Sequence, residues 1–104
     1  MEKGEVFDTN LLIEGKGELT TIFNVIEYPK VLEREIEVLF PEKKDFTKAI
    51  ELMVMLLKKG KPIPTLDAVL ASMCINRNLI LRTRDKHFKK VAEEFSGFKA
   101  KIES

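Results

Sequence analysis

The sequence contains no tryptophan, one cysteine and one histidine among its 104 residues. The cysteine, Cys74, lies in the apolar stretch LDAVLASMCI, and we interpret it as a small buried hydrophobic residue rather than a nucleophile. So few cysteines and histidines exclude a zinc site built from those ligands. A single imidazole also cannot serve as both the acid and the base of a metal-free ribonuclease. Catalytic chemistry must therefore rest on other side chains.

Long hydrophobic runs are absent as well. No apolar segment approaches the roughly 20 residues that a membrane-spanning helix needs. The first residues, MEKGEVFDTNLLI, do not have the pattern of a secretory leader. We therefore expect a cytoplasmic protein without a membrane partner. With 44% hydrophobic and 34% charged residues, the chain is expected to fold as a single domain over residues 1–104.

The net charge of +1 conceals an uneven distribution of charged residues. Residues 1–76 carry 13 acids and 10 bases, whereas residues 77–104 carry 8 bases and 4 acids. A basic flank beside an acidic pocket would attract an anionic polymer. An ordinary solvated surface is the alternative interpretation of the same charges.

The pattern of apolar residues, turn residues and helix caps predicts strands that alternate with helices. The expected strands lie around residues 5–7, 19–23, 36–41, 79–83 and 98–102, and a new element is expected to start at residues 11–13. The expected helices lie around 24–35, where Pro29 kinks or restarts the helix, 46–59, 66–76 and 85–95. Asp45 and Thr65 are expected to cap helices, and Asn78 to end one in a left-handed conformation. This order predicts a three-layer α/β/α fold with a mostly parallel central sheet.

The helix expected over residues 46–59 is apolar on almost every side in its second half. A chain of this length has difficulty burying such a helix completely. We therefore expect a partner to cover part of its surface, and a homodimer is one arrangement that would do so.

Four carboxylates are expected to meet at one edge of the sheet. Asp8 follows the first strand and Asp85 follows the strand at 79–83, and ligand sites of parallel sheets lie outside the carboxyl ends of the strands. Asp67 lies in the first turn of a helix, and Glu27 lies on the helix after the second strand. Any one of these aspartates could simply be a residue that favours a helix start. Their coincidence at one edge predicts a site.

Carboxylates gathered in a partly dry pocket resist joint ionisation unless cations neutralise them. The cluster therefore predicts a divalent metal, and ligation by oxygen atoms suits Mg²⁺ or Mn²⁺. Such a metal lowers the pKa of a bound water and holds a phosphodiester for in-line attack. The pattern therefore favours a nuclease.

The segments that carry these acids are VFDTNLLI, NVIEYP, PTLDAVLASM and LRTRDKHF. In this order they resemble the four acidic motifs of PIN-domain ribonucleases, and the chain is similar to a truncated VapC-type toxin of a toxin–antitoxin pair. The resemblance spans nearly the whole chain. It implies an Mg²⁺- or Mn²⁺-dependent endoribonuclease that cuts single-stranded RNA, leaves a 5′-phosphate and a 3′-hydroxyl, and binds a small antitoxin protein.

The resemblance also implies roles for individual residues. The metal-binding and catalytic quartet would be Asp8, Glu27, Asp67 and Asp85. Asn10 and Thr83 would hold the carboxylates and waters in place. The residues expected to contact RNA phosphates are Arg82, Arg84, Lys86, His87, Lys89 and Lys90, although an ordinary solvated surface is an equally good interpretation of each basic residue.

The sequence departs from the family pattern at two places. Asp8 and Glu27 are closer together than is usual, which shortens the helical region between them and could alter the substrate groove or the dimer surface. His87 stands where many relatives carry another acid, which weakens the negative cluster and leaves open whether one metal or two are bound.

Competing functions fit the residues less well. A phosphate-receiving signalling domain needs an acidic pair directly after its first strand, and a haloacid-dehalogenase-type phosphatase needs two aspartates separated by one residue. Thr9 and Asn10 occupy those positions here. The remaining alternative is a catalytically silent PIN-like subunit that binds RNA or serves in assembly.

Overall fold

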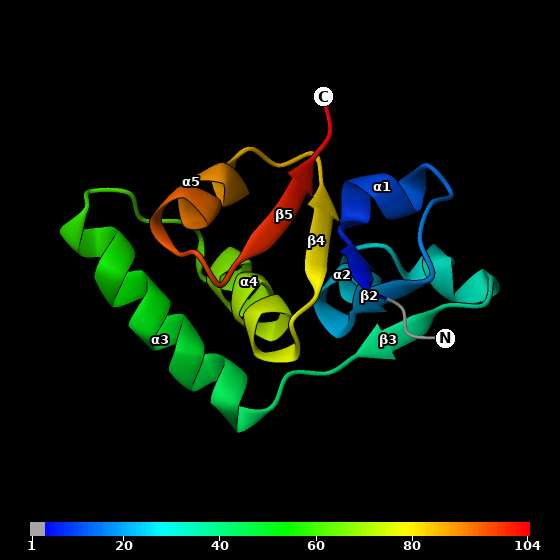
Figure 1. The fold of residues 1–104 in the computed structure, drawn as a ribbon. Helices are drawn as coiled ribbons and strands as arrows, with labels where there is room; N and C mark the ends of the chain where they lie inside the picture. Colours follow the sequence, from blue (N-terminus) through cyan, green and yellow to red (C-terminus); the bar gives the residue numbers. More distant parts are fainter. Residues whose placement is uncertain (1–3) are drawn as a thin grey trace.

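The computed structural model describes residues 4–104, and the strand pairings in it are parallel (Figure 1). One sheet has the order β1-β4-β5, and a second sheet pairs β2 with β3. The strands are β1 (Glu5–Phe7), β2 (Leu19–Thr21), β3 (Glu37–Leu39), β4 (Ile80–Thr83) and β5 (Lys99–Ile102). The two sheets are joined where the Thr20 hydroxyl donates to the Phe7 carbonyl at 2.7 Å.

Helices alternate with these strands in the predicted order. They are α1 (Thr9–Ile13), α2 (Ile22–Glu27), the 3₁₀ helix η1 (Pro29–Glu33), α3 (Lys43–Lys58), α4 (Thr65–Arg77) and α5 (His87–Glu94). Figure 1 shows α4 behind the three-stranded sheet, with α3 along its outer side. The fold class is therefore α/β with a mostly parallel sheet, as the sequence predicted.

Two element boundaries around β2 and α2 differ from the prediction. The expected strand at 19–23 ends at Thr21, because the Thr21 side chain accepts a hydrogen bond from the Asn24 N–H and so begins a helix. That helix ends before Pro29, where the chain restarts, which is one of the two predicted outcomes, and the new helix is the 3₁₀ helix η1. Proline disfavours helical backbone in the residue before it, and Tyr28 accordingly has φ −142° and ψ 73°.

Two of the predicted helix caps are wrong. Helix α3 begins three residues earlier than expected, and Asp45 lies inside its first turn, where its carboxylate accepts the Glu42 N–H at 2.7 Å. Thr65 is the first residue of α4, and the capping position belongs to Pro64. The predicted helix end at Asn78 is confirmed, because this residue is left-handed, with φ 54° and ψ 46°.

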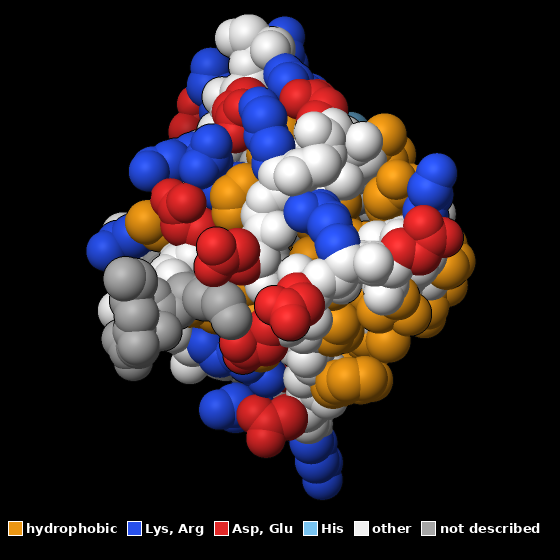
Figure 2. Space-filling model, turned by 90° about the vertical axis from the view of Figure 1, so that its right-hand side faces the viewer, with side chains coloured by type: hydrophobic (Ala, Val, Ile, Leu, Met, Phe, Trp, Pro, Cys, Tyr) orange, Lys and Arg blue, Asp and Glu red, His pale blue; other side chains and the backbone are white. Residues whose placement is uncertain are grey.

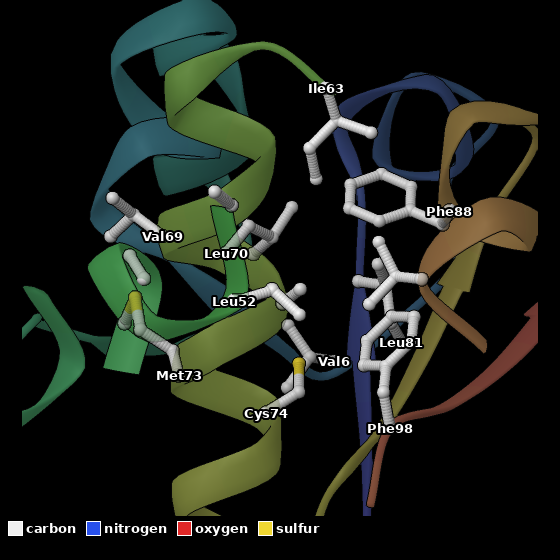
Figure 3. Close-up of a cluster of buried hydrophobic side chains, with 14 of the residues drawn as sticks. Val6, Leu52, Ile63, Val69, Leu70, Met73, Cys74, Leu81, Phe88 and Phe98 are labelled. Carbon is white, nitrogen blue, oxygen red and sulfur yellow. The ribbon is translucent and has the colours of Figure 1, made fainter. Parts of the chain in front are cut away.

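The larger hydrophobic cluster lies between α4 and the three-stranded sheet (Figure 3). Residues 68–74 of α4 are all buried. The buried side chains that surround them include Val6, Leu52, Ile63, Leu81, Phe88 and Phe98. Cys74 is among the buried residues of this helix, with 1% of its surface exposed, and burial raises the pKa of its thiol to about 12. Its interpretation as a buried hydrophobic residue is confirmed.

A smaller cluster covers the opposite side of β1. It consists of Leu12 from α1, Val25 from α2 and Val31 from η1, with Phe7 packed against it. Val6 belongs to the larger cluster, so successive residues of β1 point to opposite sides, as strand geometry requires. Packing on both sides fixes the direction in which the chain leaves the carboxyl end of β1.

Helix α3 has two apolar faces. The buried face, which includes Ala49, Leu52 and Leu56, belongs to the larger cluster. The residues of the second face are Phe46, Ile50, Val54 and Leu57, whose exposed fractions range from 47% to 68%. The chain itself therefore leaves one side of this helix uncovered, as the sequence predicted. Within residues 4–104 no helix is both long and apolar enough to cross a membrane.

Candidate functional site

The candidate site lies at the carboxyl ends of β1 and β4. Asp8 directly follows β1, and Asp85 lies between β4 and α5. Asp67 comes from the first turn of α4, and His87 is the first residue of α5. Because β1 and β4 are parallel neighbours, their carboxyl ends meet at one edge of the sheet, and the side chains that follow them converge there.

Asp8 is held by three hydrogen-bond donors. Its Oδ1 accepts the Thr9 backbone N–H at 2.8 Å and the Asn24 side-chain amide at 2.8 Å. Its Oδ2 accepts the Thr83 hydroxyl at 2.7 Å. The Thr83 hydroxyl in turn accepts the Asp85 backbone N–H at 3.0 Å, so this threonine links the two segments that carry the aspartates. Asp8 is therefore both the cap of α1 and a carboxylate with a fixed orientation.

Asp67, Asp85 and His87 form a group that could hold a metal ion. Each residue offers one ligand atom, and these atoms all lie within 4.8 Å of one another. His87 Nδ1 is 3.2 Å from Asp85 Oδ1 and 3.5 Å from Asp67 Oδ2. Carboxylate oxygen and imidazole nitrogen are both common ligands of divalent transition metals. The donor set could therefore hold a divalent metal ion, and it adds a nitrogen to the oxygen ligands that the sequence predicted.

The ionised form of Asp67 is disfavoured where it stands. Burial raises the pKa of this carboxyl above its ordinary value, and the charges of Asp85 and Asp8 raise it further, while His87 opposes the effect. A bound cation would remove the repulsion between these carboxylates. Because the charge of Asp8 contributes to the raised pKa of Asp67, Asp8 also interacts electrostatically with this group.

Glu27 joins the site through a chain of hydrogen bonds. It is the last residue of α2, and its Oε1 accepts the Thr9 hydroxyl at 2.6 Å. The Asn24 amide donates to that hydroxyl at 3.0 Å as well as to Asp8. Within the part of the chain that the structure describes, the group of mutually close ligand atoms includes neither Glu27 nor Asp8. The predicted quartet therefore divides into this pair and the pair of aspartates beside His87.

Sequence analysis named Thr83 among the residues that hold the carboxylates, and Thr83 donates to Asp8, but it missed Asn24. Asn24 is 2% exposed, and the Thr21 hydroxyl donates to its Oδ1 at 2.7 Å, which leaves the amide group to donate toward Asp8. The available signal was a threonine three residues before an asparagine, a spacing typical of a helix start. His87 was predicted to contact phosphates, and the structure places it against two carboxylates.

Asn10 contacts the segment that follows β4. Its Oδ1 accepts the Arg84 backbone N–H at 3.3 Å. The Arg84 guanidinium bonds the Glu14 carboxylate at 2.7 Å, and this hydrogen bond lowers the pKa of Glu14 to about 2. Both contacts fasten the region of α1 to the segment that leads to Asp85. One of the arginines predicted to contact RNA is thus engaged within the chain.

Other predicted RNA contacts lie in two different settings. Arg82 bonds the carboxylates of Glu5 and Glu103, each at 3.1 Å, so it is also engaged within the chain. Lys86 and Lys89 line a hollow of about 540 Å³ together with residues of α5 and β5. Figure 2 shows acidic and basic side chains interspersed over the side of the molecule that carries β3 and α1, with hydrophobic side chains gathered along the right-hand edge of the view.

No protein-family model and no curated protein matches this sequence. Solved structures with the same fold do exist. The chain is similar over 94% of its length to 96% of a chain in the structure of VapBC-1 from nontypeable Haemophilus influenzae, with a TM-score of 0.73 and 16% sequence identity. VapBC2 from Rickettsia felis, bound to a DNA fragment from its promoter, gives a TM-score of 0.73 at 17% identity, covering 94% of this chain and 97% of that chain.

A third similar structure is a toxin–antitoxin complex from Klebsiella pneumoniae. The match covers 91% of this chain and 98% of a chain in that complex, with a TM-score of 0.62 and 15% sequence identity. At such identities the likeness establishes the fold. The chain therefore has the fold of a protein found in toxin–antitoxin complexes.

Proposed function

We propose that this protein is a divalent-metal-dependent endoribonuclease of the PIN type, which cuts single-stranded RNA and acts as the cytoplasmic toxin of a toxin–antitoxin pair. The observation that carries the proposal is the convergence of Asp67, Asp85 and His87 beside Asp8 at the carboxyl ends of β1 and β4. The likeness in fold to chains of toxin–antitoxin complexes supports the same conclusion.

The four carboxylates form two pairs with different roles in the proposed reaction. Mg²⁺ or Mn²⁺, when bound, acidifies a water molecule and neutralises charge on the phosphodiester. Asp67 and Asp85 would hold the ion. Asp8, fixed by its three donors, and Glu27, fixed by the Thr9 hydroxyl, are acceptors that can orient a water molecule and take its proton. No histidine pair is required.

RNA reaches the carboxylates from the side of α5 in this proposal. Lys86 directly follows Asp85 in the chain, and Lys89 lines the same hollow as Lys86. Lysine side chains bind phosphates without regard to base sequence. Base specificity then depends on the shape of the groove and on unpaired bases, which favours a single-stranded substrate.

A matrix of metals and variants tests this function. Wild-type protein, Asp8→Asn and Asp67→Asn are incubated with an end-labelled mixed RNA pool in Mg²⁺, Mn²⁺ or excess chelator, with Glu51→Gln on the exposed surface of α3 as the matched control. We expect cleavage by the wild type and the control only, and only with metal. The products should carry a 5′-phosphate and a 3′-hydroxyl. Undiminished cleavage in chelator, or 2′,3′-cyclic phosphate ends, contradicts the mechanism.

A catalytically silent assembly subunit is the second candidate. One observation favours it, namely the exposed apolar face of α3 formed by Phe46, Ile50, Val54 and Leu57. The same matrix separates the two functions. A silent subunit leaves every RNA intact under all metal conditions, while it still binds a protein partner through α3.

We propose that the exposed face of α3 binds an acidic, amphipathic segment of the antitoxin. The four apolar residues of this face recur at helical spacing, and the exposed lysines that flank them are Lys43, Lys44, Lys58 and Lys59. In a homodimer packed helix to helix, lysines would face lysines in either orientation. An acidic partner instead gains favourable charge interactions together with apolar burial.

Light scattering and peptide binding distinguish these partners. The probe is a synthetic helical peptide with leucines on one face and glutamates beside them, and the control is the same peptide with lysines in place of the glutamates. We expect a monomer at micromolar concentration that binds the acidic peptide only. A stable dimer that binds neither peptide would favour the homodimer over the antitoxin.

A further inference from the structure

His87 occupies an unusual position for the only histidine of the sequence. Its backbone N–H donates to Asp85 Oδ1 at 2.9 Å, and its ring Nδ1 lies 3.2 Å from that same oxygen. The ring nitrogen also lies 3.5 Å from Asp67 Oδ2, which belongs to a different helix. The Nδ1 atom of the imidazole therefore lies close to one oxygen of each of the two carboxylates.

We propose that His87 is itself a metal ligand, through Nδ1, and that it makes this site select transition metals such as Mn²⁺, Co²⁺ and Zn²⁺ over Mg²⁺. The inference rests on the metal site of the proposed function. A site composed of carboxylate oxygens suits Mg²⁺, which binds nitrogen poorly and keeps several of its waters. An imidazole suits the first-row transition metals, whose affinity for nitrogen rises along the series from manganese to copper.

Hydrogen bonds and helix geometry position the segments that carry these ligands. Asp85 is fixed because its backbone N–H donates to the Thr83 hydroxyl at 3.0 Å, and its side chain accepts the His87 N–H. The backbone of Asp67 is positioned by the first turn of α4, and its Oδ2 lies 3.5 Å from His87 Nδ1. Three ligand atoms from two segments, the first turn of α4 and the residues at the start of α5, thus lie within 4.8 Å of one another, and one of them is nitrogen. Substituting His87 by a residue with an oxygen ligand therefore changes the ligand type while the other two ligands stay where they are.

A rival role for His87 predicts the opposite result. As a protonated imidazolium, the ring would serve as a counter-ion for Asp67 and Asp85 and would compete with any metal. Removing it would then tighten metal binding. As a ligand, its removal weakens the binding of transition metals by at least about tenfold, because even residues that only support a ligand cost that much when mutated.

Calorimetric titration with Mn²⁺, Co²⁺, Zn²⁺ and Mg²⁺ separates these roles. The proteins are the untagged wild type, His87→Gln and His87→Asp, with Glu51→Gln on the exposed surface of α3 as the matched control. We expect the wild type and the control to prefer transition metals, His87→Gln to lose at least about tenfold in their affinity, and His87→Asp to shift its preference toward Mg²⁺. Tighter binding by His87→Gln, or equal affinities in all four proteins, overturns the inference.

The single histidine also provides a readout that is independent of any variant. In an NMR spectrum of the untagged protein its imidazole resonances are unique. Zn²⁺ should shift them strongly at stoichiometric concentration, and Mg²⁺ should shift them far less and only at much higher concentration. Unshifted resonances with saturating Zn²⁺ overturn the inference, even if RNA cleavage proves metal-dependent. Shifted resonances in a protein that cuts no RNA would support the ligand and remove the proposed function.

Discussion

Replacing Asp67 by asparagine should change the stability of the protein in opposite directions with and without metal. In the absence of metal, ligand atoms of Asp67 and Asp85 lie within 4.8 Å of each other. Two unit charges at that separation repel by about 1 kcal/mol even at the dielectric constant of water. Asp67→Asn removes this repulsion and nearly keeps the shape of the side chain. We therefore expect the free energy of unfolding to rise by about 1 kcal/mol in chelator, or about 4 °C in melting temperature.

This gain should depend on pH in a defined direction. The pKa of Asp67 is raised in the folded protein above its ordinary value of 3.8, first by burial and then by Asp85 and Asp8. A raised carboxyl pKa costs stability once the pH passes the unfolded value, and the cost is complete above the folded value. The difference between Asp67→Asn and wild type should therefore vanish as the pH falls below 3.8 and reach its full size at neutral pH.

Metal should reverse the order of the two proteins. At about 100 times the dissociation constant, a ligand that binds only the folded state adds about 2.7 kcal/mol. Wild type should gain this stability from Mn²⁺, and Asp67→Asn should gain far less because it has lost a ligand. Scanning calorimetry of both proteins at pH 8, in chelator and in Mn²⁺, measures all four midpoints. Equal midpoints in chelator together with equal shifts by Mn²⁺ would show that Asp67 is only a helix residue.

Three further results are expected. Asp45→Asn should lower the free energy of unfolding, measured by urea titration, by about 2 kcal/mol, because the buried carboxylate loses its charged hydrogen bonds to Arg77. Unchanged stability would show that this ion pair does not stabilise the fold. Cys74 should react with Ellman's reagent only after the protein unfolds, since burial raises the pKa of its thiol to about 12. Rapid reaction of the folded protein would contradict the burial of this thiol. Ile50→Ser should change stability by no more than about 0.5 kcal/mol yet abolish binding of the acidic peptide by fluorescence anisotropy.

The positions of the acids could be predicted because they depend on chain order. A buried strand that ends at Asp8 and another that ends before Asp85 must place both residues at the carboxyl edge once the strands are parallel. This placement follows from the order of strands and acids along the chain and does not require the distances between segments.

The contacts of the site could not be predicted because they depend on distances between segments. His87 and Asp67 are 20 residues apart in the sequence, and their contact arises only when α5 is placed beside α4. Asn24 resembles an ordinary helix residue until the fold brings its amide to 2.8 Å from Asp8. Arg84 was expected to contact RNA because its partner Glu14, 70 residues away, could not be identified from sequence alone.

Two aspartates that look alike in the sequence illustrate what the fold adds. Asp45 and Asp67 both lie in the first turn of a helix, where the helix dipole favours a negative charge. Although burial opposes it, Arg77 and the Glu42 N–H lower the pKa of Asp45. The pKa of Asp67 is raised by its own burial and by neighbouring acids. Asp45 therefore has its counter-charge within the chain and stabilises the contact between α3 and α4. Asp67 faces other carboxylates, and that environment is the one in which a cation from solution has most to contribute.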